Sequence, residues 1–77
     1  MSKWELNHSG NVILVKNSVA GEKLFVNGEL QDERNGLSLR SRLYGKLPTG
    51  ENIKVSLGGW FSTQCRIFVD HKLISPK

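Results

Sequence analysis

Hydrophobic and polar residues alternate along much of the chain, in short segments that are separated by glycines. The segments are rich in Val, Ile, Leu and Phe, and the glycines stand at positions 10, 21, 28, 36, 45, 50, 58 and 59. No long stretch shows apolar residues at helical spacing together with helix start and stop signals. The pattern predicts an all-β domain, a small antiparallel β-sandwich or flattened barrel of about six to seven short strands.

The first half of the chain predicts three strands, followed by a short edge segment at Leu30 and a polar loop. The strands cover residues 4–6, 12–16 and 23–26. The connections are a turn at 8–10, a loop over 17–22, an Asn-Gly turn at 27–28 and the polar loop over 31–36. Because residues 12–15 are four consecutive apolar residues, we expect the second strand to be a central one.

The second half predicts three more strands in an antiparallel meander. They cover residues 37–44, 52–57 and 65–70, and Leu73 and Ile74 are expected to cap the core. The turn over 45–50 is expected to place Leu43 opposite Ile53, and therefore Arg42 opposite Lys54. The loop beyond residue 57 is expected to place Val55 opposite Ile67, Ser56 opposite Arg66, and Lys54 opposite Phe68.

Strand parity then assigns the side chains of this meander to two faces. The inner face is apolar and forms a core from Leu37, Leu39, Leu43, Ile53, Val55, Leu57, Cys65, Ile67 and Val69. The outer face is basic with interleaved aromatics, and it carries Arg40, Arg42, Tyr44, Lys54, Arg66, Phe68 and Asp70.

The distribution of charge gives this outer face a possible function. The formal net charge is +4, but residues 1–38 hold four basic and five acidic residues, whereas residues 39–77 hold seven basic and two acidic ones. A basic sheet face with aromatic rings can bind single-stranded nucleic acid. It can also be a solvated face whose basic side chains cover Phe68 and Tyr44, or a face on which Trp4 or a second copy of the chain covers Phe68.

Other candidate chemistry is weaker. Cys65 with Asp70 and His71 raises the hypothesis of a cysteine nucleophile, but Cys65 is expected to face the core as a small packed hydrophobe. His8, His71 and one cysteine do not form a metal-binding spacing, and Gly58–Gly59 lacks the lysine and helix of a phosphate loop. We therefore expect no catalytic residue, metal, cofactor or small-molecule substrate. Trp60 and Phe61 are a candidate interaction loop, unless one ring closes the end of the core.

Size and composition predict one thin-cored domain over residues 1–77, which self-association would stabilise. The longest apolar run is residues 12–15, so no membrane-spanning helix is expected. The N-terminal residues 1–5 show no secretory signal, and a lone cysteine makes no internal disulfide. Together these features predict a cytoplasmic protein.

The order of these elements resembles one domain of the Fas apoptotic inhibitory molecule family. The similarity lies in Trp4-Glu5-Leu6, residues 12–16, Ala20-Gly21-Glu22-Lys23, Leu24-Phe25-Val26-Asn27-Gly28 and Cys65-Arg66-Ile67. The resemblance implies a compact intracellular β-sandwich without known catalytic residues that acts through protein contacts. Vertebrate members usually carry two such domains, and this chain has room for one.

Two functions are therefore expected. The first is a non-enzymatic cytoplasmic module that binds a protein partner or a second copy of itself. The alternative is single-stranded nucleic-acid binding through the basic, aromatic-interleaved sheet face.

Overall fold

The computed structural model describes residues 2–36, 40–58 and 64–75, and these residues form strands and turns. The strands are β1 (Ser2–His8), β2 (Asn11–Ser18), β3 (Gly21–Val26), β4 (Glu29–Asn35), β5 (Arg40–Lys46), β6 (Asn52–Gly58), β7 (Gln64–Val69) and β8 (Lys72–Ser75). The described part contains no helix long and apolar enough to cross a membrane. The all-β prediction is confirmed, with eight strands where six or seven were expected.

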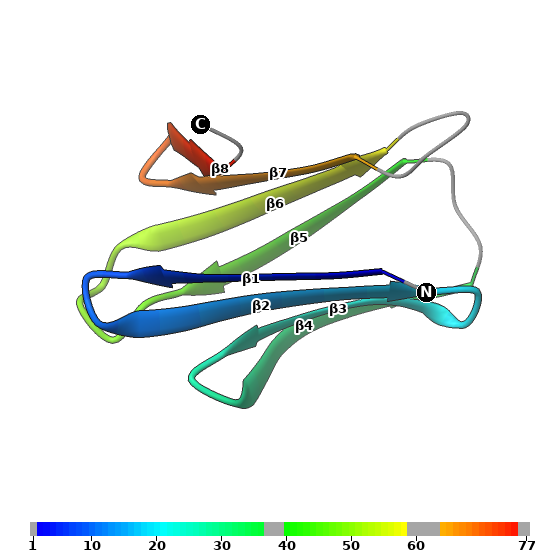
Figure 1. Cartoon of the computed structure of the whole chain (residues 1–77), viewed down its shortest axis with the longest axis horizontal. Coiled ribbons are helices and arrows are strands. Elements are labelled where there is room, and N and C mark those ends of the chain that lie inside the picture. The colour runs from blue at the N-terminus through cyan, green and yellow to red at the C-terminus, as the bar shows by residue number, and fades with distance from the viewer. Residues whose placement is uncertain (1, 37–39, 59–63, 76–77) are drawn as a thin grey trace.

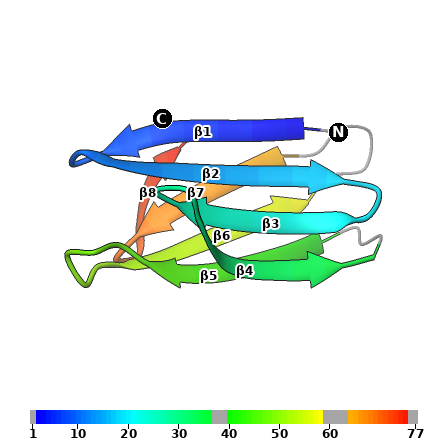
Figure 2. The ribbon, with the colours of Figure 1, turned by 90° about the horizontal axis from the view of Figure 1, so that it is seen from below.

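The strands form two antiparallel sheets that pack face to face (Figures 1 and 2). One sheet has the order β1-β2-β3-β4 and the other has the order β5-β6-β7-β8. No ladder joins β4 to β5 in the described residues, so the fold is a sandwich and not a closed barrel. Each sheet comes from one half of the chain, and the difference in charge between the halves therefore becomes a difference between the sheets.

Alternating residues of both sheets fill the space between them. The buried cluster consists of Ile13, Val15, Leu24, Val26, Leu43, Leu47, Ile53, Val55, Leu57, Cys65, Ile67 and Val69. This confirms the predicted inner face of the second half, except for Leu37 and Leu39, which lie outside the described residues. Trp4, Leu6 and Ile74 pack against the rim of the cluster and are partly buried.

The prediction that residues 12–16 form a central strand is also confirmed, because β2 lies between β1 and β3. Ile13 and Val15 are fully buried, whereas Val12 and Leu14 are half-buried on the outer face. On that face, the Nζ atom of Lys16 lies 5.4 Å from the ring centre of Phe25, an aromatic residue of β3. The long lysine side chain thus shields part of an outward-facing ring.

Three of the connections are two-residue turns in which both residues have positive φ: Ser9–Gly10, Asn27–Gly28 and Asp70–His71. This backbone conformation matches the twist of the flanking strands. Asn27 also bonds through its side chain, since its Oδ1 accepts the Val12 N–H at 2.9 Å and its Nδ2 donates to Asn11 at 3.0 Å. The Asn-Gly turn that the sequence predicts therefore also ties β2 to the end of β3.

The prediction of a polar loop over residues 31–36 is wrong. Residues 29–35 form β4, which pairs with β3 and has a bulge where Leu30 lies opposite Phe25 and Asp32 lies opposite Leu24. Six of its seven residues are exposed, because β4 is an edge strand with no core on its outer side. A strand of this kind lacks the alternation from which strands are predicted.

Two side chains of β4 bond the open edge of β5 and so connect the two sheets. The Oδ2 atom of Asp32 accepts the Tyr44 N–H at 2.9 Å, and the Oε1 atom of Gln31 accepts the Lys46 N–H at 3.4 Å. Asp32 also accepts the N–H of Glu33 through its other oxygen. These bonds bring β4 beside β5 at one side of the sandwich.

The predicted pairing between β5 and β6 is wrong by two residues, although the predicted faces are right. Leu43 lies opposite Val55, and Arg42 lies opposite Ser56. The reason is the position of the turn, which is centred on Thr49 and not on Pro48, because the Leu47 N–H donates to the Glu51 carbonyl. When the centre of a hairpin moves by one residue, the pairing of its strands changes by two. No like charges therefore face each other at Arg42.

The end of the chain also differs from the prediction. Leu73 and Ile74 belong to β8, which pairs with β7. Ile74 packs against the core, as expected, but Leu73 is 45% exposed. By contrast, the predicted pairing of β6 with β7 is confirmed, with Val55 opposite Ile67 and Ser56 opposite Arg66.

One carboxylate is buried among the apolar residues. Glu22 is 4% exposed, and its Oε1 atom accepts the hydroxyl of Ser41, itself buried, at 2.8 Å. Its Oε2 atom has no hydrogen-bond partner. This pair joins β3 to β5 across the space between the sheets.

Candidate functional site

The outer face of the second sheet is a grid in which each row crosses β5, β6 and β7. The pairings define three rows: Arg40–Gly58–Gln64, Arg42–Ser56–Arg66 and Tyr44–Lys54–Phe68. Six of the seven residues that the sequence predicts on the outer face therefore point to one side of one sheet. The seventh, Asp70, lies in the turn between β7 and β8 and not on the strand as expected. Lys54 and Phe68 are direct neighbours, as expected, whereas Tyr44 and not Arg42 lies across from Lys54.

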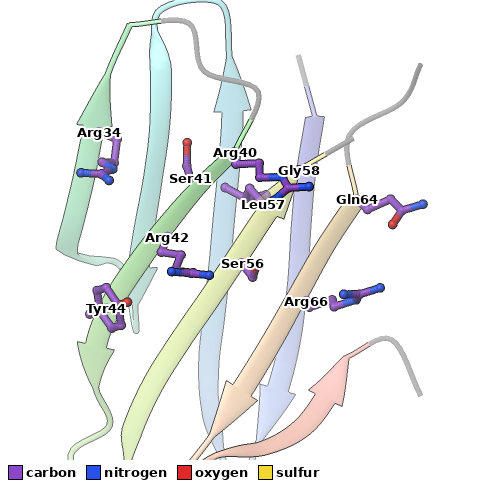
Figure 3. A pocket seen from close by; sticks show the side chains of 10 residues that line it. All are labelled: Arg34, Arg40, Ser41, Arg42, Tyr44, Ser56, Leu57, Gly58, Gln64 and Arg66. Atoms are coloured by element: carbon purple, nitrogen blue, oxygen red, sulfur yellow. The ribbon is translucent and has the colours of Figure 1, made fainter. Parts of the chain in front are cut away.

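A hollow of about 730 Å³ opens over two of these rows (Figure 3). The described residues that line it are mostly basic or polar: Arg34, Arg40, Ser41, Arg42, Tyr44, Ser56, Leu57, Gly58, Gln64 and Arg66. We call it the arginine hollow. Four of the six outer-face residues in these rows line it, whereas Lys54 and Phe68, which share a row with Tyr44, do not.

The hollow exists because the middle strand carries the smallest side chains. Gly58 and Ser56 of β6 leave the sheet backbone open between long side chains on β5 and β7. In Figure 3, Arg40 and Arg42 extend from β5 toward Gly58 and Ser56. Neighbouring strands lie about 4.8 Å apart, so β5 and β7 form walls separated by about 10 Å.

Arg34 is the residue of this site that sequence reasoning missed. It lies on β4, in the acidic half of the chain and in the segment interpreted as a loop. Because Asp32 and Gln31 hold β4 against the edge of β5, Arg34 reaches the wall that Arg40, Arg42 and Tyr44 form. No local sequence signal indicates this approach, since it depends on how the two sheets meet.

The electrostatic character of the hollow is uniformly positive. The described residues that line it include four arginines and no aspartate or glutamate. Within the described part of the chain, Arg34, Arg42 and Arg66 form no ion pair. Guanidinium groups bind phosphate and carboxylate through two parallel hydrogen bonds, so the arrangement can hold an anion.

The two aromatic residues of the face differ in their availability. Tyr44 is 55% exposed at the wall of the hollow. Phe68 is half-buried, and the Nζ atom of Lys54 lies 5.6 Å from the centre of its ring. The interpretation that basic side chains cover the aromatics therefore fits Phe68, while Tyr44 remains open to a ligand.

Trp4 does not cover Phe68. Trp4 lies opposite Val15 and packs against the core, so it occupies the inner face of the first sheet. The candidate interaction loop, Trp60 and Phe61, lies outside the described residues.

The structure does not bring Cys65, Asp70 and His71 together. Cys65 faces the core, and burial raises the pKa of its thiol to about 11. Asp70 and His71 form an exposed turn, where the Oδ1 atom of Asp70 accepts the Asn52 N–H at 2.8 Å. Across the described ranges, no group of three or more His, Cys, Asp or Glu residues is arranged to hold a metal ion.

Comparisons with known proteins assign the chain to no group. No protein-family model, no curated protein and no solved structure matches it. The resemblance to the Fas apoptotic inhibitory molecule family therefore stays a prediction, and proposals about function depend on the geometry of the chain itself.

Proposed function

We propose that this domain is a non-enzymatic, cytoplasmic binding module, and that the arginine hollow is its ligand-binding face. The observation that carries the proposal is the gathering of four arginines and an exposed tyrosine around one open hollow without a lining carboxylate. Positive charges gathered at one place oppose folding through mutual repulsion. An anionic ligand would relieve that repulsion.

Single-stranded nucleic acid is the ligand that suits these groups best. Its phosphates match the guanidinium groups of Arg42 and Arg66, which stand on opposite walls of the hollow. Its bases can stack on an aromatic ring, and Tyr44 offers one at the same wall as Arg42. Of the two functions that the sequence leaves open, the hollow favours nucleic-acid binding over binding of a protein partner.

The experiment is fluorescence anisotropy of labelled single-stranded DNA and RNA oligonucleotides over a range of salt concentrations. Each phosphate that is neutralised on a single strand contributes about −0.7 to the slope of log K against log salt. Four arginine contacts therefore predict a slope of about −2.8, or about 50-fold weaker binding at 200 mM than at 50 mM salt. Absence of binding at low salt would refute the proposal.

Two charge-matched variants separate this site from general basic character. Arg42→Glu with Arg66→Glu reverses two charges inside the hollow, whereas Lys23→Glu with Lys72→Glu reverses two exposed charges elsewhere. We expect the first pair to abolish binding and the second to weaken it only slightly. Equal losses in both proteins would contradict the assignment of the hollow.

Tyr44 provides an independent test of stacking. Stacking of one base on an aromatic ring contributes about 1–3 kcal/mol, so Tyr44→Ala should weaken binding by about tenfold. Tyr44→Phe keeps the ring and should bind nearly as well as the original protein. If the two variants bind alike, the ring has no role in recognition.

A further inference from the structure

We propose that the open edge of β1 pairs with β1 of a second copy of this chain. The two strands would run antiparallel about a two-fold axis at Trp4, and the two first sheets would join into one continuous sheet. The arginine hollow lies over the other sheet and takes only Arg34, on the opposite edge strand β4, from this one. The interface therefore does not depend on the function proposed for the hollow.

The backbone hydrogen bonds show which residues of β1 face the open edge. Both the N–H and the carbonyl of Val12 bond to Asn27, toward the β3 side of β2. Because backbone groups alternate in direction along a strand, Ile13 and Val15 turn theirs toward β1. Their partners Leu6 and Trp4 are thereby bonded to β2, and the N–H and carbonyl groups of Lys3, Glu5 and Asn7 point away from the sheet.

Within the described residues, this edge lacks most of the features with which proteins protect open strands. β1 is seven residues long, contains no proline, and pairs with β2 without a bulge. Proline, bulges, short strands, covering segments and charged side chains are the usual protections. Of these, β1 has only the charged side chains of Lys3 and Glu5, which are opposite in sign. The opposite edge of the same sheet has two of them, because β4 is bulged and lies against β5.

Charge selects one register for the pairing of β1 with itself. Lys3 and Glu5 both present backbone groups to the edge, so they can form hydrogen-bonded pairs across it. With the axis at Trp4, Lys3 of each copy lies opposite Glu5 of the other, and two pairs of opposite charge form. With the axis at Glu5, two carboxylates would face each other, which is unfavourable.

The same register also buries apolar side chains at the rim of the core. Trp4 and Leu6 pack against the rim of the buried cluster, on the inner face of the sheet, and both keep some exposure. With the axis at Trp4, the two Trp4 side chains become direct cross-strand neighbours on that face. Aromatic pairs of this kind stabilise antiparallel sheets, and the pairing also removes apolar surface from water.

The test is sedimentation equilibrium over a range of concentrations, with circular dichroism and thermal melting to confirm that each variant folds. The original protein should dimerise, and Lys3→Glu or Glu5→Lys should each raise the dimer dissociation constant about tenfold or more, because like charges then face each other. Lys16→Glu is the matched control, since Lys16 is an exposed neighbour of Lys3 on β2 and not on the edge.

Charge exchange distinguishes the proposed register from any other association. The double variant Lys3→Glu/Glu5→Lys restores opposite charges and should dimerise like the original protein. A mixture of the two single variants should form a heterodimer, since each then meets the complementary pair. A protein that stays monomeric at all concentrations would overturn the proposal, as would dimers that Lys3→Glu does not weaken or single variants that do not associate when mixed.

Discussion

Replacement of Gly21 by alanine tests the way in which β4 is held against the rest of the fold. Gly21 begins β3 with φ of +141°, a conformation that side chains rarely adopt. A Cβ atom at this position would overlap the carbonyl oxygen of Arg34 and lie 3.0 Å from the Cα atom of Asn35. Both are backbone atoms of β4, so relief requires that the end of this strand move away.

The cost of this movement follows from the bonds that it breaks. The pairing of Gly21 with Asn35 and the hydrogen bond from the Gly36 N–H to the Ala20 carbonyl would be lost. Each lost hydrogen bond costs about 1 kcal/mol, and the strained backbone adds roughly 1–3 kcal/mol. We expect Gly21→Ala to lower the free energy of unfolding by roughly 2–4 kcal/mol, a large share of the total for so small a domain.

Gly10→Ala is the matched control. Gly10 also has positive φ, at +79°, but a Cβ atom there would meet no atom within 4 Å. Gly10→Ala should therefore lower the free energy of unfolding only through the strained backbone of alanine at positive φ, by about 1 kcal/mol. This corresponds to a fall of about 4–8 °C in melting temperature. Gly21→Ala should lower the melting temperature by on the order of 15 °C. Thermal and urea denaturation followed by circular dichroism measure both effects, and equal losses would refute the argument from steric overlap.

Three further predictions concern single buried or bridging groups. Because burial raises the thiol pKa of Cys65 from 9.0 to about 11, the unfolded chain ionises first as the pH rises. The cysteine contribution to stability should therefore be constant below pH 9 and decline between pH 9 and 11. Cys65→Ala should remove that part of the decline in urea midpoints, and identical pH profiles would contradict it. Asp32→Ala removes the acceptor for the Tyr44 N–H and should cost about 1–2 kcal/mol, whereas removal of the neighbouring exposed carboxylate by Glu33→Ala should cost almost nothing in the same denaturation assay. Ser41→Ala leaves the buried carboxylate of Glu22 without its hydrogen-bond donor and should cost about 1–3 kcal/mol, while Ser41→Ala combined with Glu22→Leu should recover that loss. A double variant that is less stable than Ser41→Ala would contradict this, because it would show that the buried carboxylate of Glu22 stabilises the fold even without the hydroxyl of Ser41.

The alternation of residue types was enough to assign side chains to faces. Ile53, Val55 and Leu57 are buried as predicted, and Arg42 and Arg66 point outward as predicted. This works because successive side chains of a strand point to opposite faces whatever its partner is. The basic character of the outer face was thus accessible from the sequence.

The pairing of β5 with β6 was not accessible in the same way. A shift by two residues leaves every side chain on its original face, so the hydrophobic pattern cannot distinguish the two registers. The bond from Leu47 to Glu51 centres the turn on Thr49, one residue further along the chain than expected, and places Leu43 opposite Val55. That shift brings Ser56 between Arg42 and Arg66 and so creates the floor of the hollow.

The sequence by itself determined the all-β class, the two contiguous halves of unlike charge, the inner and outer faces of the second half, and the Asn27–Gly28 turn. These properties depend on local periodicity and turn chemistry, which act over a few residues. Only the tertiary structure decided that residues 29–35 form an edge strand, that Asp32 holds it to β5, and that Arg34 joins the other arginines. An edge strand has little buried surface to pattern its sequence, and a site that combines two sheets depends on contacts between residues far apart in the chain.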